Sequence, residues 1–223
     1  MSSSAERLPG RRSRSTRQKE QLSPDELSST GISPISLANG DVYEGELRQG
    51  KPNGRGKLRR TNGNVYEGPF QDGRAHGQGV CQFADGSVWE GQFRDGKLHG
   101  QGIYRFANGS VFEGEWEGKL HGQGTYRYAS GHVYKGQFQH GKAHGQGVLH
   151  ESNGDVYDGE FREGKPHGQG VLHVSNGDVY EGEVRDGKPH GQGTRRYTTG
   201  EIHEGYYKEG WWHGQGTCRY ANG

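Results

Sequence analysis

The chain has 223 residues, of which only 27% are hydrophobic and 25% are charged, and its formal net charge is +1. So little apolar material cannot fill a thick two-layer core, and such a composition is often that of a disordered chain. Glycine argues against general disorder, because its 43 copies recur at a regular period. A fixed period predicts a repeat protein.

Targeting and anchoring signals are not found in the sequence. No apolar run approaches the ~20 residues of a membrane-spanning helix, and residues 1–21 are polar, unlike a secretory signal. Ser2 stands where myristoylation needs glycine. Cys81 and Cys218 fall in the same column of the repeat, six repeats apart, so strand spacing places them about 55–60 Å from each other, too far for a disulfide. We therefore expect a cytoplasmic protein.

The first 29 residues differ from the remainder. They are rich in serine and arginine, and residues 1–20 hold six Lys or Arg against two Glu, so we predict a disordered, weakly basic tail. A half repeat follows at residues 30–42, because residues 30–40 align with residues 144–154. Pro34 in this segment cannot donate a backbone hydrogen bond, which suits an edge strand.

Eight repeats occupy the rest of the chain, and an aromatic residue, here called position zero, begins each of them. The repeats start at Tyr43, Tyr66, Trp89, Phe112, Tyr134, Tyr157, Tyr180 and, with the aromatic replaced, His203. The spacing is 23 residues throughout, except for 22 between Phe112 and Tyr134. The missing residue lies within residues 115–118, which predicts a shortened turn there.

Each repeat predicts two β-strands. Residues 42–47 alternate in side-chain character as a strand does, and segments such as residues 103–106 are β-branched and aromatic. Pairs such as Asn62-Gly63 and Asn108-Gly109 end these segments and are typical of type I′ hairpin turns. No part of the array has helical periodicity, so the sequence predicts an all-β antiparallel meander.

These motifs resemble a known family. The string aromatic-Glu-Gly-x-aromatic-x-x-Gly-Lys-x-His-Gly-x-Gly is similar to the MORN repeat (membrane occupation and recognition nexus), and the similarity covers residues 30–223. The resemblance implies an elongated, twisted, single-layer antiparallel sheet with a groove. The family includes radial-spoke head proteins, junctophilins, plant phosphatidylinositol-phosphate kinases and protist cytoskeletal proteins, which suggests a cytoskeletal or ciliary setting. Fold transfers through such a resemblance more firmly than function.

The aromatic columns are the candidate site. Position zero, the glycine two residues later and the aromatic four residues later share one face of the strand. These rings form either the core of the sheet or a groove for a partner helix or peptide. The candidate partner-binding groove consists of Tyr66, Phe70, Trp89, Phe93, Phe112, Trp116, Tyr134, Phe138, Tyr157, Phe161 and Tyr180.

Metal, nucleotide and nucleic-acid sites are not expected. One histidine per repeat, from His76 to His213, would lie about 9–10 Å from the next, whereas zinc needs its nitrogens within ~2.1 Å. Gly-x4-Gly-Lys strings such as Gly91 to Lys97 lack the Ser or Thr and the helix of a phosphate-binding loop. Residues 41–223 balance 22 Lys or Arg against 23 Asp or Glu, unlike a nucleic-acid surface.

These observations favour a non-catalytic interaction scaffold. Each residue type recurs along a line, so no catalytic constellation or cofactor site converges at one point. The alternative is a phospholipid-associated regulatory module, within a larger protein such as a lipid kinase. We also expect the last strand, residues 216–220, to have an open edge, which indicates either a longer array or a homodimer through that edge.

Overall fold

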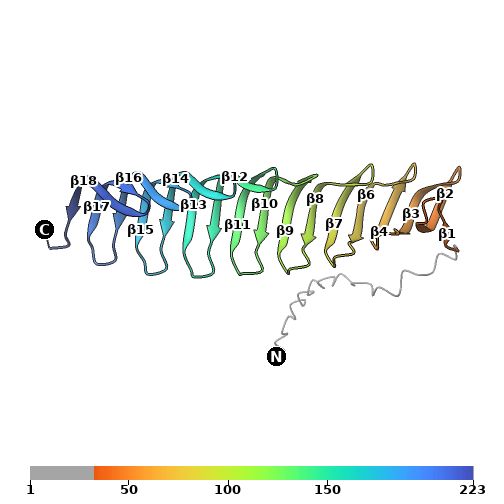
Figure 1. The fold of residues 1–223 in the computed structure, drawn as a ribbon, viewed down its shortest axis with the longest axis horizontal. Helices are drawn as coiled ribbons and strands as arrows, with labels where there is room; N and C mark the ends of the chain where they lie inside the picture. The colour runs from red at the N-terminus through yellow and green to blue at the C-terminus, as the bar shows by residue number, and fades with distance from the viewer. Residues whose placement is uncertain (1–32, 223) are drawn as a thin grey trace, which may run out of the picture. The chain divides into compact units, whose positions relative to one another are not determined.

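The computed structural model describes residues 33–222, and these residues form one open antiparallel sheet of 18 strands without a helix (Figure 1). The strands pair in sequence order from β1 (Ile35–Ser36) to β18 (Trp211–Arg219), except that the two short strands β5 (Arg74–Ala75) and β6 (Gly77–Gln82) both pair with β4 (Val65–Gln71). The predicted all-β single-layer sheet is therefore confirmed. The expected disordered tail and the first residues of the half repeat lie outside the described residues.

Each repeat contributes one hairpin. The first strands are β2 (Val42–Arg48), β4 (Val65–Gln71), β7 (Val88–Arg94), β9 (Val111–Glu117), β11 (Val133–Gln139), β13 (Val156–Arg162), β15 (Val179–Arg185) and β17 (Ile202–Lys208). The second strands are β3 (Lys51–Arg59), β5 (Arg74–Ala75) with β6 (Gly77–Gln82), β8 (Lys97–Arg105), β10 (Leu120–Arg127), β12 (Lys142–His150), β14 (Lys165–His173), β16 (Lys188–Arg196) and β18.

Register places all the position-zero rings on one face of the sheet, here called the front face. Tyr66 pairs with Leu58 on one side and Cys81 on the other, and directly opposed residues share a face. The glycines two residues after position zero pair with a second glycine column, as Gly68 does with Gly56. The glutamates beside position zero, such as Glu67, point to the back face.

The paired positions require glycine because an aromatic ring lies over each pair and leaves no room for a Cβ. A Cβ on Gly56 would lie 2.6 Å from the Tyr43 ring, and one on Gly45 would lie 2.5 Å from the Gly56 Cα. The Tyr43 hydroxyl donates to the Glu46 carbonyl at 2.8 Å, and four other position-zero tyrosines make the same bond. The ring is thus held flat on its own hairpin.

Rings of successive repeats then pack edge to face. Tyr134 meets Phe138 of its own repeat at 5.1 Å and Phe161 of the next at 4.7 Å, at interplanar angles of 88° and 69°. Tyr66 meets Phe70 and Phe93 in the same way. Edge-to-face packing is favourable because it places the positive edge of one aromatic ring against the negative face of the next. A single layer therefore buries its core by laying rings over glycine and interlocking them along the sheet.

A bulge within each hairpin explains a further column of the repeat. In β3 the residues around Gly54 bulge opposite Glu46, whose carboxylate accepts the Arg55 backbone N–H at 3.1 Å. Glu160 and Glu183 accept the equivalent N–H groups of Gln169 and Gln192. These acidic side chains satisfy backbone donors that the bulge removes from the ladder.

The turn types differ from the prediction. At Asn62-Gly63 only the glycine has a positive φ, +88°, and Gly63 donates to the Arg60 carbonyl, which defines a three-residue loop. Type I′ geometry occurs instead at the other end of the hairpins, where Asp95 and Gly96 have φ of 51° and 78°. The prediction of type I′ turns at the Asn-Gly pairs is therefore wrong, because the longer loop lets asparagine remain at negative φ.

Candidate functional site

The periodic structure is interrupted between the third and fourth repeats, at a place here called the seam. In other repeats the turn glycine donates to a carbonyl of the preceding repeat, as Gly96 does to Ala75 at 2.9 Å and Gly141 does to Leu120 at 3.0 Å. The turn after β9 is one residue shorter, and Glu117 N–H bonds to the Lys119 carbonyl instead. Within the described residues, Gly118 makes no such bond to Leu98.

The core divides at the same place. Buried residues from Tyr43 to Phe93 form one cluster and those from Phe112 to Tyr207 form another. Among the residues that the structure describes, only Tyr104 and Trp116, both partly buried, pack against both clusters. The short turn thus separates two otherwise continuous sets of rings, and two aromatic side chains bridge the gap.

Trp116 differs from the other members of its column: it keeps an edge contact with Phe112 at 6.3 Å and 60°, but it is tilted, not edge-on, to the preceding position-zero ring, Trp89. Its ring stacks on Tyr104 at 5.1 Å with an interplanar angle of 10°, and it lies 5.5 Å from Trp89. Phe138, the next member of the column, remains edge-on to Phe112 at 5.2 Å. The reorientation leaves Trp116 partly exposed, whereas Phe138 is 4% exposed.

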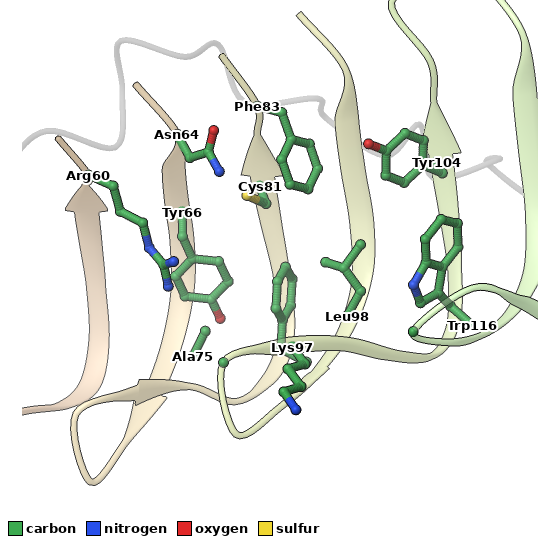
Figure 2. Close-up of a pocket in the computed structure, with 13 residues that line it drawn as sticks. Arg60, Asn64, Tyr66, Ala75, Cys81, Phe83, Lys97, Leu98, Tyr104 and Trp116 are labelled. Carbon is green, nitrogen blue, oxygen red and sulfur yellow. The ribbon is translucent and has the colours of Figure 1, made fainter. Parts of the chain in front are cut away.

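A cleft of about 430 Å³ opens at the seam on the front face. Figure 2 shows Phe83, Leu98, Tyr104 and Trp116 lining it from neighbouring strands. Tyr66, Ala75, Cys81 and Phe93 complete its apolar lining, and Arg60 supplies a charged side chain. Lys97 lies at the rim, with its side chain directed away from the rings (Figure 2). We call this space the seam cleft.

Aromatic side chains continue from the seam cleft along the second strands. Phe83 contacts Tyr104 at 5.6 Å, Tyr104 contacts Phe106 at 4.5 Å, and Phe106 contacts Tyr126 at 5.5 Å. Tyr126 in turn contacts Tyr128, which is 41% exposed. We call these five residues the aromatic strip. The columns of Tyr104 and Phe106 hold Leu149 and Glu151 in the fifth repeat and Leu172 and Val174 in the sixth, so the continuous strip ends at Tyr128, although Tyr197 and Tyr220 recur in the second column further along.

The lining of the cleft is neutral apart from its two basic residues. Burial raises the pKa of the Cys81 thiol and of the Tyr104 phenol above their usual values, so both remain protonated at neutral pH. In later repeats the lysine equivalent to Lys97 pairs with an acid of the next turn, as Lys142 does with Glu163 at 2.6 Å. The shortened turn lacks that acidic position, so Lys97 is available to a ligand.

The eleven aromatic residues predicted as a groove are divided by the structure. Ten of them are buried in the ladder of rings, with exposed fractions of 0–6%. Tyr66, Phe93 and Trp116 line the seam cleft, and Trp116 alone of the eleven is partly exposed. The other eight lie in the core, as the alternative interpretation of these columns expected.

Sequence reasoning missed Phe83, Leu98, Tyr104 and Phe106. Two signals pointed to them: the single 22-residue spacing, and the rings that fill both second-strand columns in the third and fourth repeats and in no other repeat. The arrangement can accept an apolar side chain in the cleft and an extended segment along the strip, beside a positive charge.

Each repeat is a bulged β-hairpin with one ring over a glycine pair. A tandem array of such units defines a class of repeat proteins that present one long face. The MORN repeat model matches residues 43–65, 66–88, 89–111, 112–133, 134–156, 157–179, 180–202 and 203–223. The chain belongs to the MORN-repeat family, and the expected eight repeats are confirmed.

Solved structures give only distant likenesses. The TCP10 domain of Danio rerio CPAP, solved with a STIL peptide, is 13% identical over 79% of each chain, with a TM-score of 0.49. The Drosophila melanogaster SAS-4 (dCPAP) TCP domain, solved with a proline-rich motif of Ana2, is 12% identical, with a TM-score of 0.45; 91% of this chain and 99% of that one are covered. At these TM-scores the likenesses carry no functional argument. No curated protein matches the sequence. The described residues include no helix long and apolar enough to span a membrane.

Proposed function

We propose that the protein is a non-catalytic scaffold that holds a segment of a partner protein across the seam cleft and the aromatic strip. The partner inserts an aliphatic or aromatic side chain beside Leu98 and Trp116. An acidic residue next to that side chain faces Arg60, and Lys97 lies at the rim of the cleft. The partly exposed rings at an interruption of the repeat are the observation that carries this proposal.

Several properties of the cleft support a peptide ligand. Its volume of about 430 Å³ lies within the usual range for pockets that enclose a ligand group, and its lining is largely apolar. Aromatic residues dominate the energy of many protein interfaces, because they bury much area with few rotamers. The strip would lie along an extended chain, which is a common way of binding aromatic-lined grooves. A cytoskeletal or ciliary setting remains an expectation from the family resemblance.

The lipid-associated alternative is tested by vesicle co-sedimentation. The second strands carry Arg105 and Arg127 on the back face, where Glu90 and Glu113 lie on the neighbouring strands. Such mixed charge gives little attraction to anionic lipid. Co-sedimentation of the full chain with phosphatidylserine vesicles at physiological salt should leave it in the supernatant. Salt-resistant pelleting would favour the alternative.

Peptide selection against the full chain tests the proposal directly. Selected peptides should share an apolar residue next to Asp or Glu, and their Kd can be measured by fluorescence anisotropy. The double variant Tyr104→Ala with Phe106→Ala should weaken binding at least about 10-fold, because hot-spot rings each contribute more than about 1 kcal/mol.

Two matched controls keep the result specific. Leu172→Ala with Val174→Ala changes the same two columns of the front face away from the seam, and Arg105→Ala with Arg127→Ala changes the back face. Both controls should bind like the wild type. If either control weakens binding as much as the seam variant, or if no peptide is selected, the proposed site is wrong.

Alanine variants of Tyr134 and Phe138 are poor tests of binding. Their side chains are 1% and 4% exposed, so their removal creates a cavity in the ladder of rings.

A further inference from the structure

The last repeat breaks the pattern of its family at position zero. Seven repeats place Tyr, Trp or Phe there, and the structure lays the ring over a glycine pair. The eighth has His203, whose glycine pair is Gly205 and Gly216. Histidine is too short to cover these glycines as tyrosine does, so another side chain must replace it.

Trp212 takes this place from the neighbouring strand. Its Nε1 would lie 2.9 Å from a Cβ on Gly205 and 2.7 Å from one on Gly216, where the tyrosine hydroxyl lies in other repeats. Its ring packs on the His203 ring at 4.6 Å and 33°. With the glycines covered by Trp212, the His203 ring is free to make polar contacts elsewhere.

Those contacts are with two further residues that depart from the repeat. Nε2 of His203 lies 2.8 Å from Oε1 of Glu201, and Sγ of Cys218 lies 3.4 Å from the same oxygen. Glu201 stands two residues before position zero, where other repeats have Asp, Asn, Ser or His. Cys218 is the direct cross-strand partner of His203.

The three ligand atoms lie within 4.8 Å of one another, and among the described residues this is the one such group of three. The side chains of His203 and Glu201 are 17% and 31% exposed. A neutral imidazole, a thiolate and a carboxylate are the donors that zinc binds in proteins. We propose that Glu201, His203 and Cys218 bind a single Zn²⁺ ion, with a fourth coordination position open to solvent.

The two ligand separations to Glu201 are close to those that this assignment requires. Bonds of about 2.0–2.3 Å in tetrahedral geometry place ligand atoms roughly 3.3–3.7 Å apart. The Sγ to Oε1 distance of 3.4 Å is within this range, and the 2.8 Å between Nε2 and Oε1 must increase slightly. The Nε2 to Sγ separation is at most 4.8 Å. All three side chains arise from one hairpin, so side-chain rotations of Glu201, His203 and Cys218 are the movements that complete the tetrahedral spacing.

The histidine column does not compete for this ion. Its members are separated by two strand spacings, about 9–10 Å, and so cannot share a metal within one chain. The expectation of no metal site considered that column, and none of its members belongs to the group of Glu201, His203 and Cys218.

Co²⁺ substitution provides a test with a spectroscopic readout. The full chain, treated with a chelator and dialysed, is titrated with Co²⁺ and then with Zn²⁺. We expect one equivalent of Co²⁺ to give tetrahedral visible bands and a thiolate-to-metal charge-transfer band, and Zn²⁺ to displace both. Calorimetry should give one tight Zn²⁺ site per chain.

Variants distinguish a specific metal site from non-specific binding of the ion to the protein. Cys218→Leu restores a residue found in this column at Leu58, Leu149 and Leu172, and it should fold while losing the charge-transfer band. His203→Gln should weaken Zn²⁺ binding at least about 10-fold, because one ligand is removed. The matched control Cys81→Leu should retain the band and the affinity.

Three results would overturn the proposal. They are the absence of tight Zn²⁺ binding by the wild type, a charge-transfer band that persists in Cys218→Leu, or one that disappears in Cys81→Leu. Circular dichroism of each variant shows that the β-sheet is intact. Zn²⁺ should also raise the Tm of the wild type and leave that of Cys218→Leu unchanged, since only the folded site binds the ion.

Discussion

At the scale of single residues, the array depends on glycines that a Cβ would displace. Gly136 and Gly147 lie beneath the Tyr134 ring, and a Cβ on Gly136 would be 2.6 Å from both the Gly147 Cα and the Tyr134 hydroxyl. The backbone cannot move aside there without breaking the pairing of β11 and β12. The ring and its glycines therefore act as one structural unit.

Substitution of Gly136 tests this unit. We expect Gly136→Ala to lower the free energy of unfolding by about 2 kcal/mol or more through overpacking, measured by urea denaturation. Gly86→Asn is the control: Gly86 has open space around it and a φ of +89°, which asparagine tolerates better than other residues. It should cost less than about 1 kcal/mol. Equal stability of Gly136→Ala and the wild type would refute the stacked-ring core.

Buried tyrosines also predict a response to alkaline pH. Burial raises the pKa of Tyr66, Tyr134 and Tyr157 from 10.0 to about 12. The protonated phenols therefore stabilise the fold fully below pH 10, and this contribution is lost as pH rises from 10 towards 12. The Tm should fall over this range as the tyrosinate absorbance rises. Ionisation of all tyrosines near pH 10 without a change in Tm would contradict the burial.

At the scale of elements, the type I′ turns keep successive hairpins in register. From the second repeat on, these turns consist of a residue at positive φ, such as Asp95 or Glu163, followed by a glycine that donates to the preceding repeat. The turn at Gly118 lacks the first of these residues, and with it the bond to Leu98. The seam cleft is a consequence of this single missing residue.

Restoring the missing residue should close the seam. We predict that an Asp inserted between Glu117 and Gly118 re-forms the bond to the Leu98 carbonyl and places a carboxylate near Lys97. One backbone hydrogen bond contributes about 1 kcal/mol, which for a chain of this size corresponds to a Tm increase of roughly 2–4 °C. A lower Tm in differential scanning calorimetry would show that the short turn is not a defect in the ladder.

At the scale of the whole molecule, the periodic features and the place of the shortened turn could be predicted from the sequence, and the side-chain rearrangements at the exceptions could not. The 23-residue spacing and the glycine columns predict the hairpins and their faces, because strand period and pairing are local. The division of rings between core and cleft depends on side-chain orientation, which a one-residue deletion changes at Trp116. The role of His203 depends on Trp212 reaching across from the adjacent strand, and no periodic pattern shows this.

The edge strand β18 is the surface through which the sequence predicts a homodimer. Trp211 and Tyr220 are 79% and 66% exposed, and among the described strands β18 pairs with β17 alone. The homodimer through this edge stays a prediction.

The affinity of a selected peptide for the Asp-insertion variant tests the central claim most directly. The variant keeps every side chain of the aromatic strip, so only the opening at the seam changes. If the seam cleft is the binding site, the insertion should weaken binding at least about 10-fold while Tm rises, because the inserted side chain can no longer be enclosed. An unchanged Kd in a variant of raised Tm would show that the partner binds elsewhere on the sheet.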